Sequence, residues 1–387
     1  MVNFDSEKTQ NLNLSPKELA ILMHHCSGLI DDEILRKLFS ATNGMLILTK
    51  QQAHNLRLIV DVCLTKVLNP DEADILSQIF KKLSPNYLTR QISEQMAERE
   101  FGSLEDLQEF TNSFMEKQNN IPDPELGGFT PAQAHKLLYT EWDNPECSMK
   151  LSHNLSFEEV KGIPLYHNAI TLLKTLIDLK ESPTVTAKGN LNRKAVKAML
   201  DDFMIDEETF SSIFKYNKVI NELDVFDIWR TRQICYYAGL IRKQKNKFIV
   251  TRKAQNLLSP ENAGKLYPQL FLAFFRKFSM VGFDHLSELD DFQATMVFSI
   301  FQLSLLAKKE IRFEKIYKKL ALPAIVEYCE EIAERYVPVS TQIDYRIIKP
   351  LMYAGLLDCK YKKVDYFMQV DTVRINKVFQ EFISFTL

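Results

Sequence analysis

The stretch that decides the fold is 226–258, which reads FDIWRTRQICYYAGLIRKQKNKFIVTRKAQNLL. We expect a long helix over about 222–239 that stops at Gly239, because glycine takes the left-handed conformation without a Cβ penalty. The residues 242–251 then predict a tight β-hairpin that turns near Lys245. A helix followed at once by a short ribbon is therefore the central feature of the predicted fold.

The residues before this stretch complete a recognisable order of elements. We expect helices at 164–180, 192–200 and about 206–215, with a short β-prone piece at 183–186 after the first helix. Helix, short strand, helix, helix, hairpin is the order of a winged helix-turn-helix. About twenty residues separate the second helix from the helix before the hairpin, where the standard motif has only a few. This insertion argues against a DNA-reading geometry.

A second stretch has the same order of elements and ends in the same way. Tyr353-Ala354-Gly355-Leu356-Leu357 matches Tyr237-Ala238-Gly239-Leu240-Ile241, and a longer hairpin is expected after it. Pro350 is the exception, because proline inside a helix removes a backbone donor and should kink the helix or delay its start. The expected elements before this hairpin are helix 292–307, strand 311–313, and helices 314–320 and 323–335.

The segment 185–258 also resembles a known type of sequence. The shared features are T-x-x-G-x-L at 186–191, A-G-L-I at 238–241, and an apolar-Thr strand end that leads into a helix. It resembles the winged-helix-like segment of uncharacterised bacterial proteins, related to that of plasmid ORF-3-type and transposon passenger proteins. The resemblance implies a bacterial or mobile-element origin and a fold, and it carries no catalytic residue to transfer.

The N-terminal region reads as amphipathic helices without strand-like alternation. Capping signals such as Ser15-Pro16-Lys17-Glu18 predict helix starts near 16, 70, 131 and 157. The Asn-, Pro- and Gly-rich stretch 117–128 is the best candidate linker. The helices expected before it are 16–27, 31–40, 50–68, 71–83, 87–99 and 103–117.

We therefore expect a mostly α fold, with a helical N-terminal region followed by two winged-helix-like units that carry short β-hairpins. The predicted parts are a helical domain at 1–120, a linker with a connecting helix at 121–163, and winged-helix-like units at 164–262 and 263–387.

Composition limits the possible roles. The 387 residues carry 48 Lys and Arg against 50 Asp and Glu, so no global field attracts nucleic acid or a membrane, and such binding would need a local patch. The six scattered cysteines predict reduced thiols in a cytoplasmic protein. The first twenty residues have no apolar signal-peptide core, and the most apolar helix, 292–307, is too short and polar to span a bilayer, so we expect no membrane partner.

No catalytic constellation is evident. The sequence contains no Walker pattern, no G-x-S-x-G and no H-E-x-x-H. Cys147, His153, His135 and Asp143 share a segment, but their spacing fits no zinc pattern, and surface or core roles explain them more simply. We name no catalytic, cofactor-binding or metal-binding residue, and we do not expect an enzyme.

The strongest functional signal is a cluster of cations around the first hairpin, which could neutralise several phosphates. Against it, Glu222, Asp224 and Asp227 begin the preceding helix, where a recognition helix usually meets base edges. Lysines on a hairpin also serve simply to keep a strand edge solvated. The candidate nucleic-acid-binding residues are Arg230, Arg232, Arg242, Lys243, Lys245, Lys247, Arg252 and Lys253.

Two functions follow from this pattern, and a third hypothesis, an enzyme of unrecognised type, ranks below them because no constellation of residues supports it. The first is a non-enzymatic protein-interaction or scaffold protein built on winged-helix units, whose partner is another protein or a second copy. The alternative is a nucleic-acid-binding accessory or regulatory protein that uses the basic wing 242–253. Fold alone does not decide between them.

Overall fold

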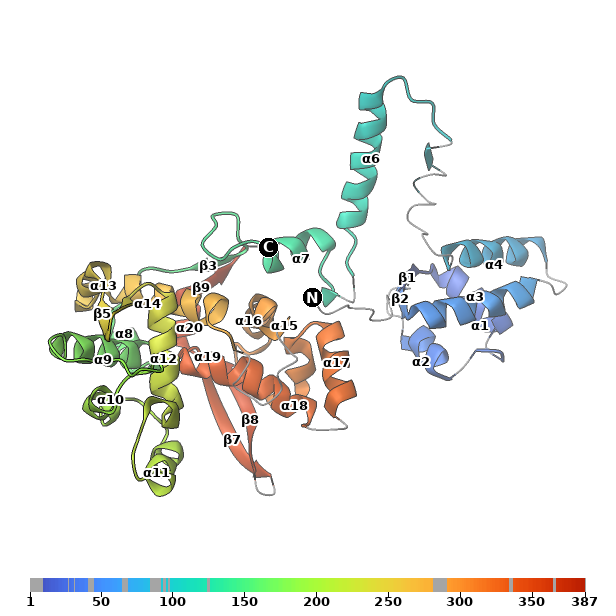
Figure 1. The fold of residues 1–387 in the computed structure, drawn as a ribbon. Coiled ribbons are helices and arrows are strands. Elements are labelled where there is room, and N and C mark those ends of the chain that lie inside the picture. The colour runs from blue at the N-terminus through green and yellow to red at the C-terminus, as the bar shows by residue number, and fades with distance from the viewer. Residues whose placement is uncertain are drawn as a thin grey trace. The chain divides into compact units, whose positions relative to one another are not determined.

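The computed structural model describes residues 10–26, 28–30, 32–40, 45–64, 69–83, 92, 95–96, 98–123, 126–280, 291–333, 337–364 and 367–386. Over these residues the protein is mostly helical, with small antiparallel sheets (Figure 1). The chain divides into two compact units, 1–132 and 133–387. No helix in the described ranges combines the length and the apolar character that crossing a bilayer requires.

The first unit packs four helices and a two-stranded ribbon around one apolar core, from Leu12 to Leu83. Another helix, α6 (Leu104–Asn119), follows later in the chain (Figure 1). The core elements are β1 (Gln10–Asn13), α1 (Pro16–Cys26), α2 (Asp32–Ser40), β2 (Met45–Leu48), α3 (Lys50–Leu64) and α4 (Pro70–Lys82).

The ribbon β1–β2 corrects the expectation of helices alone in this region. The two strands pair antiparallel, with Leu12 opposite Leu46, and both leucines are almost fully buried. Alternation in Asn11-Leu12-Asn13-Leu14 is the period of a half-buried strand, but four residues are too few to predict one. Burial against the helices stabilises the pair.

The expected helix 87–99 lies largely outside the described residues.

The predicted helix starts at 16, 70, 131 and 157 are confirmed. In α1, the backbone N–H of Ser15 donates to Glu18 Oε2 at 2.7 Å, and the backbone N–H of Glu18 donates to Ser15 Oγ at 3.2 Å. Asn69 accepts in the same way from the backbone N–H of Glu72. These caps satisfy donors that the first helical turn leaves unpaired, so the start is decided within four residues.

The first half of the second unit contains the predicted helices and the first hairpin. Its elements are α7 (Pro131–Leu138), which lies at the boundary, β3 (Met149–Leu151), α8 (Phe157–Val160), α9 (Pro164–Asp178), α10 (Arg193–Leu200), α11 (Glu207–Tyr216), η3 (Glu222–Asp224), α12 (Phe226–Tyr237), β4 (Ile241–Gln244), β5 (Lys247–Val250) and α13 (Arg252–Leu257).

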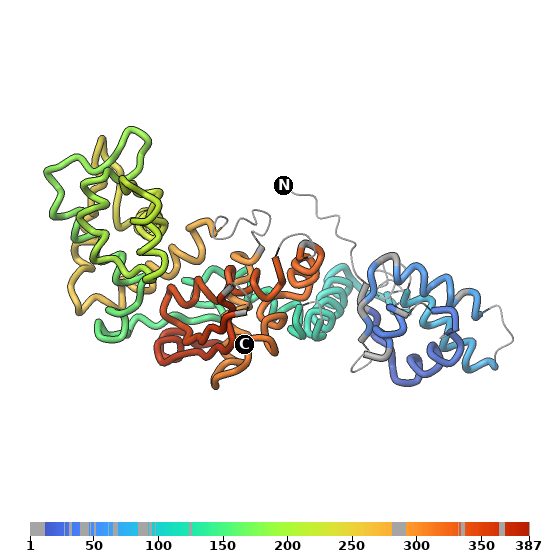
Figure 2. Tube along the Cα trace, turned by 90° about the horizontal axis from the view of Figure 1, so that it is seen from below, coloured from blue at the N-terminus to red at the C-terminus, as the bar shows by residue number. Residues whose placement is uncertain are grey.

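The second half continues through η4 (Pro260–Asn262), α14 (Ala263–Leu272), the π-helical turn η5 (Ala273–Lys277), α15 (Asp291–Ala294), α16 (Met296–Leu306), β6 (Ile311–Arg312), η6 (Phe313–Lys315), η7 (Tyr317–Leu320), α17 (Pro323–Ala333), α18 (Val339–Ile343), the π-helical turn η8 (Asp344–Ile348), α19 (Lys349–Tyr353), β7 (Leu357–Val364), β8 (Phe367–Ile375), α20 (Lys377–Phe382) and β9 (Ile383–Phe385). In Figure 2 the green-to-yellow part of this unit and the orange-to-red part trace two neighbouring lobes.

Both predicted hairpins are present directly after their glycines. In the first, Ile241 pairs with Val250, and Lys245 takes the positive φ of 50° that the tight turn requires. In the second, β7 and β8 pair over eight positions with an irregularity at Lys360/Tyr361, and β6 pairs with β8 to make a three-stranded sheet.

The two helix-to-hairpin turns share their hydrogen bonds. At the first turn, the backbone N–H of Leu240 donates to Cys235 O, and at the second the N–H of Leu356 donates to Leu351 O. The glycines before these residues have φ of 69° and 73°. This 6→1 bond with a left-handed glycine is the Schellman helix stop.

The predicted delay of the helix start at Pro350 is wrong, because α18, η8 and α19 follow one another without a break. It sits near the start of α19, directly after the π-helical turn η8. Across this turn the backbone N–H of Lys349 donates to Asp344 O, five residues back. The wider turn carries the helix past the residue that has no N–H to donate, which is a common use of a π-bulge.

The first residues of the second unit pack into the core of that unit. Trp142 is 3% exposed and lies 5.8 Å, between ring centroids, from Phe271 of α14. β3 pairs with β9, with Met149 opposite Phe385. The sequence indicated no strand here, because a three-residue strand carries too little periodicity to be recognised.

Candidate nucleic-acid interface

Arg230 lies inside the protein. It is 8% exposed and forms an ion pair with Asp227, one turn earlier on α12. Its guanidinium carbon lies 3.5 Å from the centroid of the Tyr353 ring, a close cation–π contact. Burial raises the pKa of Asp227, and the Arg230 charge opposes that shift.

Arg232 is also buried and neutralised. It is 6% exposed and forms an ion pair with Glu222, whose side chain is fully buried. The same carboxylate accepts the backbone N–H of Leu191 at 2.8 Å. Arg230 and Arg232 therefore pair with Asp227 and Glu222, two of the three carboxylates that argued against phosphate binding. Both positive charges are neutralised inside the protein.

Helix α12 presents little of itself to solvent. It packs against α9 and the π-helical turn η5, and most of its residues are buried or half-buried. A recognition helix needs a free face that can enter a groove. The structure leaves no long polar face on α12 for that role.

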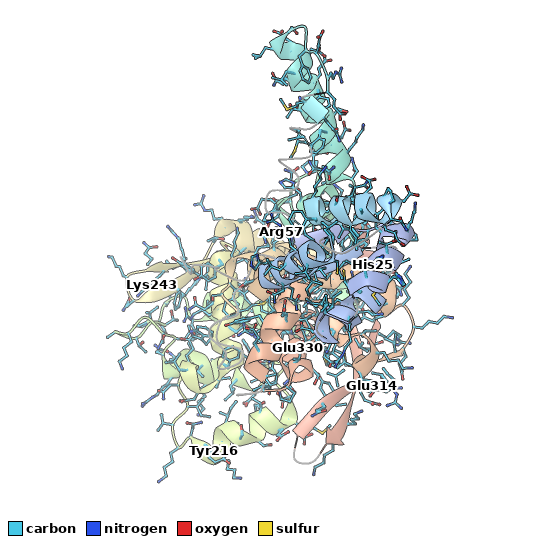
Figure 3. All side chains as sticks on the ribbon, turned by 90° about the vertical axis from the view of Figure 1, so that its right-hand side faces the viewer. His25, Arg57, Tyr216, Lys243, Glu314 and Glu330 are labelled. Carbon is cyan, nitrogen blue, oxygen red and sulfur yellow. The ribbon has the colours of Figure 1, made fainter. Side chains whose placement is uncertain are left out.

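The other six predicted cations lie at the surface. Arg242, Lys243, Lys245, Arg252 and Lys253 are exposed, and Lys247 is half-buried. Lys247 Nζ donates to the carbonyl oxygen of Lys180 at 2.8 Å. None of the six has a carboxylate partner among the described residues, so their charges are not neutralised within that part of the protein. In Figure 3, Lys243 projects from the hairpin away from the body of the unit.

Tertiary contacts bring a second basic segment to this hairpin. The backbone N–H groups of Thr184 and Val185 both donate to Asn246 O, at 3.1 and 3.0 Å. The N–H of Phe248 donates to Thr184 Oγ1 at 2.9 Å. Lys243 Nζ would lie 3.3 Å from a Cβ built on Gly189, so its side chain reaches the turn before α10.

The sequence analysis did not single out this second segment. Residues 182–200 contain Lys188, Arg193, Lys194 and Lys197 and no acidic residue, and residues 238–260 contain six cations and likewise no acid. The absence of Asp and Glu from both stretches was the feature of the sequence that could have indicated a second basic segment. Arg193 Nε donates to Asn221 Oδ1, whereas Lys194 Nζ donates to Ser182 Oγ, next to the strand-like residues that meet the hairpin. We define the basic hairpin surface as Lys188, Lys194, Arg242, Lys243, Lys245, Lys247, Arg252 and Lys253.

The second hairpin differs from the first because carboxylates pair with several of its cations. Lys360 pairs with Glu310, and Lys362 pairs with Asp371. Arg374 of β8 pairs with Asp358 across the ribbon at 2.5 Å. Its cations are therefore largely balanced by neighbouring carboxylates, although both hairpins follow the same helix stop.

A cavity and the possible metal ligands give weaker support for a functional site than the basic hairpin surface does. A cavity of about 470 Å³ between α9 and α10 is lined by His167, Lys174, Asp178 and Asp202 among others. The His167 Nε2 atom already lies 2.9 Å from the carbonyl oxygen of Asp202. Within the described ranges, no three His, Cys, Asp or Glu side chains are grouped so that they could hold a metal ion.

Comparison with known proteins bears on the same region. Residues 161–265 match the family model described as the Y4jL N-terminal domain, which is an uncharacterised family. The match runs from α9 to the first residues of α14 and includes the whole basic hairpin surface. No curated protein and no solved structure matches the chain.

Proposed function

We propose that this protein binds nucleic acid through its phosphate backbone, using the basic hairpin surface. The observation that carries the proposal is the contrast between the two hairpins. Carboxylates pair with Lys360, Lys362 and Arg374 on the second, whereas the cations of the first have no carboxylate partner in the described part of the chain. Cations held without internal partners are available to neutralise phosphates.

The mode of binding follows from what is buried. Since Arg230 and Arg232 are engaged inside the protein and the middle of α12 is buried or half-buried, the phosphate contacts come from the wing and from the turn before α10. Contacts to phosphates position a protein on nucleic acid but carry no sequence information directly. The expected binding is therefore strongly salt-dependent and tolerant of sequence.

Two winged-helix-like units, over 164–258 and 292–387, are part of the same proposal. Supporting it, both segments run from a helix through extended, paired residues to further helical elements and a hairpin. The extended residues form the isolated bridge Val185–Leu191 in the first segment and the strand β6 in the second, and the 3-10 turns η6 and η7 stand in the second segment where α10 stands in the first. Beyond the Schellman turns, Thr251 Oγ1 donates to Gly239 O, and Asn376 Nδ2 donates to Gly355 O. Recurrence of elements and of side-chain caps is what an internal repeat predicts.

The test is a fluorescence anisotropy titration of labelled oligonucleotides with the full chain, between about 50 and 200 mM salt. The double substitution Lys243→Glu with Lys245→Glu should lower affinity more than tenfold and reduce the magnitude of the log–log salt slope by about 2. Both side chains are exposed, so the thermal midpoint should stay unchanged.

The matched control is Lys360→Glu with Lys362→Glu on the second hairpin, which changes the net charge by the same amount. This variant should bind like the wild type. Equal losses in both variants, or no loss in the first, would show that the basic hairpin surface is not the binding site.

A second function, protein interaction, is favoured by one observation. The segment from the end of α11 to the start of α12 exposes large apolar side chains, including Tyr216 at 74% and Leu223 at 65%. Figure 3 places Tyr216 at an outer tip of the unit. Exposed apolar residues of this kind often mark contacts with a partner protein. Light scattering of wild type and of Tyr216→Ser with Leu223→Ser tests self-association through this segment, which predicts a larger mass for the wild type alone.

A further inference from the structure

Two exposed aromatic rings lie at the end of α12, just before the first hairpin. Tyr236 and Tyr237 are 48% and 44% exposed, and their ring centroids are 5.9 Å apart with planes inclined at 75°. Each ring has a large flat apolar face, so two neighbouring exposed rings offer a platform on which a planar ligand can stack.

Hydrogen bonds bring cations to the same end of the helix. The backbone N–H of Thr251 donates to Leu240 O at 2.9 Å, and Thr251 Oγ1 donates to Gly239 O at 3.1 Å. These bonds hold the start of α13 against the end of α12. Arg252 and Lys253, both exposed, are the first residues of α13 and therefore follow directly at this junction.

The corresponding turn before the second hairpin lacks both features. Tyr353, which occupies the position of Tyr237, is 9% exposed, lies under Arg230, and has its hydroxyl 3.1 Å from Thr231 Oγ1. Lys377, the first residue of α20, pairs with Glu159 and Glu381. Of these two turns, the first alone combines exposed rings with cations that have no carboxylate partner among the described residues, so the combination does not follow from the turn geometry itself.

This combination matches the chemistry of an unpaired nucleic-acid strand. Bases in a duplex are stacked on one another, so their faces are hidden, whereas the bases of a single strand offer faces that stack on aromatic side chains. Cations alongside the rings neutralise the backbone between successive bases.

We infer that the protein prefers single-stranded nucleic acid, with bases stacking on Tyr236 and Tyr237 and the backbone running along Arg252, Lys253 and the basic hairpin surface. This inference rests on the proposed function, because the cations supply most of the affinity and the tyrosines supply the preference. The contacts involve base faces and phosphates and make no use of the 2′-hydroxyl, so RNA and DNA strands should both bind.

The experiment compares labelled oligothymidine, oligouridine and a duplex of equal length by anisotropy, using the full chain. Wild type should bind both single strands more tightly than the duplex. Tyr236→Ala with Tyr237→Ala should weaken single-strand binding by about tenfold or more, with the salt slope unchanged, because a stacking contact releases no counterions. Duplex binding should not change.

Two variants separate stacking from a fold defect. Tyr236→Phe with Tyr237→Phe keeps the aromatic faces and should bind like wild type, and Tyr216→Ala removes an exposed ring from α11 and should also have no effect. Ultraviolet cross-linking of a bromouridine strand, read by peptide mass spectrometry, should attach it to Tyr236 or Tyr237.

The outcomes are distinct for the two proposals. If the Lys243/Lys245 charge reversal abolishes binding but the tyrosine variants bind all strands like wild type, the single-strand preference is refuted and the proposed function stands. If the charge reversal changes nothing, the proposed function is refuted as well. Equal weakening on single strands and duplex would also refute the preference.

Discussion

The guanidinium of Arg230 stacks on the ring of Tyr353, with 3.5 Å between the guanidinium carbon and the ring centroid. Arg230 lies on the helix before the first hairpin, and Tyr353 ends the helix before the second. Thr231, the next residue, places its hydroxyl 3.1 Å from the Tyr353 hydroxyl. A sequence-predicted nucleic-acid contact is therefore an internal contact that joins the two hairpin-bearing segments.

Removing Arg230 should strongly destabilise the second unit. Arg230→Ala leaves the largely buried Asp227 carboxylate without its partner, which is expected to lower the free energy of unfolding by about 3–5 kcal/mol. The double variant Asp227→Leu with Arg230→Met removes both charges and should lose much less. Denaturant unfolding measures each, with exposed Arg242→Ala as a control that should stay within about 0.5 kcal/mol of wild type. A double variant as unstable as the single one would contradict the argument.

The two glycines of the helix stops should differ in their tolerance of alanine. Gly239→Ala places a Cβ at a φ of 69° in open space, so only left-handed strain applies, at about 1–2 kcal/mol. Gly355→Ala has the same strain at 73°, and its Cβ would also lie 2.6 Å from Ile163 Cγ1. Overpacking should add about 1–3 kcal/mol. Thermal or denaturant unfolding of the pair tests the difference, and equal losses would show that the Ile163 contact relaxes without cost.

Asp344 should make stability depend on pH. Burial raises the pKa of this carboxyl from 3.8 to about 6, although the nearby Lys349 lowers it. The native state therefore binds a proton more tightly than the unfolded chain, and stability should fall as pH rises from about 4 to 6, by at most about 3 kcal/mol from this group. Asp344→Asn cannot ionise, so its stability relative to wild type should increase over that window and then level off. Urea unfolding at several pH values measures this, and a flat difference would contradict it.

Cys26 and Cys63 should be able to form a disulfide between α1 and α3. Their sulfur atoms lie 3.4 Å apart, and both residues are fully buried. Oxidised glutathione would accept the two electrons and release two molecules of reduced glutathione, at a rate limited by local opening because the thiols are covered. Non-reducing peptide mass spectrometry should find the linked peptides in wild type and not in Cys63→Ser. Cross-linking of other cysteines in place of this pair would argue against it.

Local features of this protein were predictable because their partners are close in sequence. The caps at Ser15 and Asn69 close within three residues, and the first hairpin pairs residues on either side of a turn centred on Lys245 and Asn246. The cations of the first hairpin follow from the same stretch, since a surface ribbon leaves most of its side chains in water.

The tertiary structure alone decided which cations remain available. Arg232 meets a carboxylate ten residues earlier, and Arg230 stacks on Tyr353, far along the chain. The sheet of Met149 with Phe385 and the contact of Lys243 with the Gly189 turn likewise join distant segments. A charge pattern in the sequence shows where cations are, but burial and partners at long sequence separation determine whether each one is neutralised inside the protein or left for a ligand.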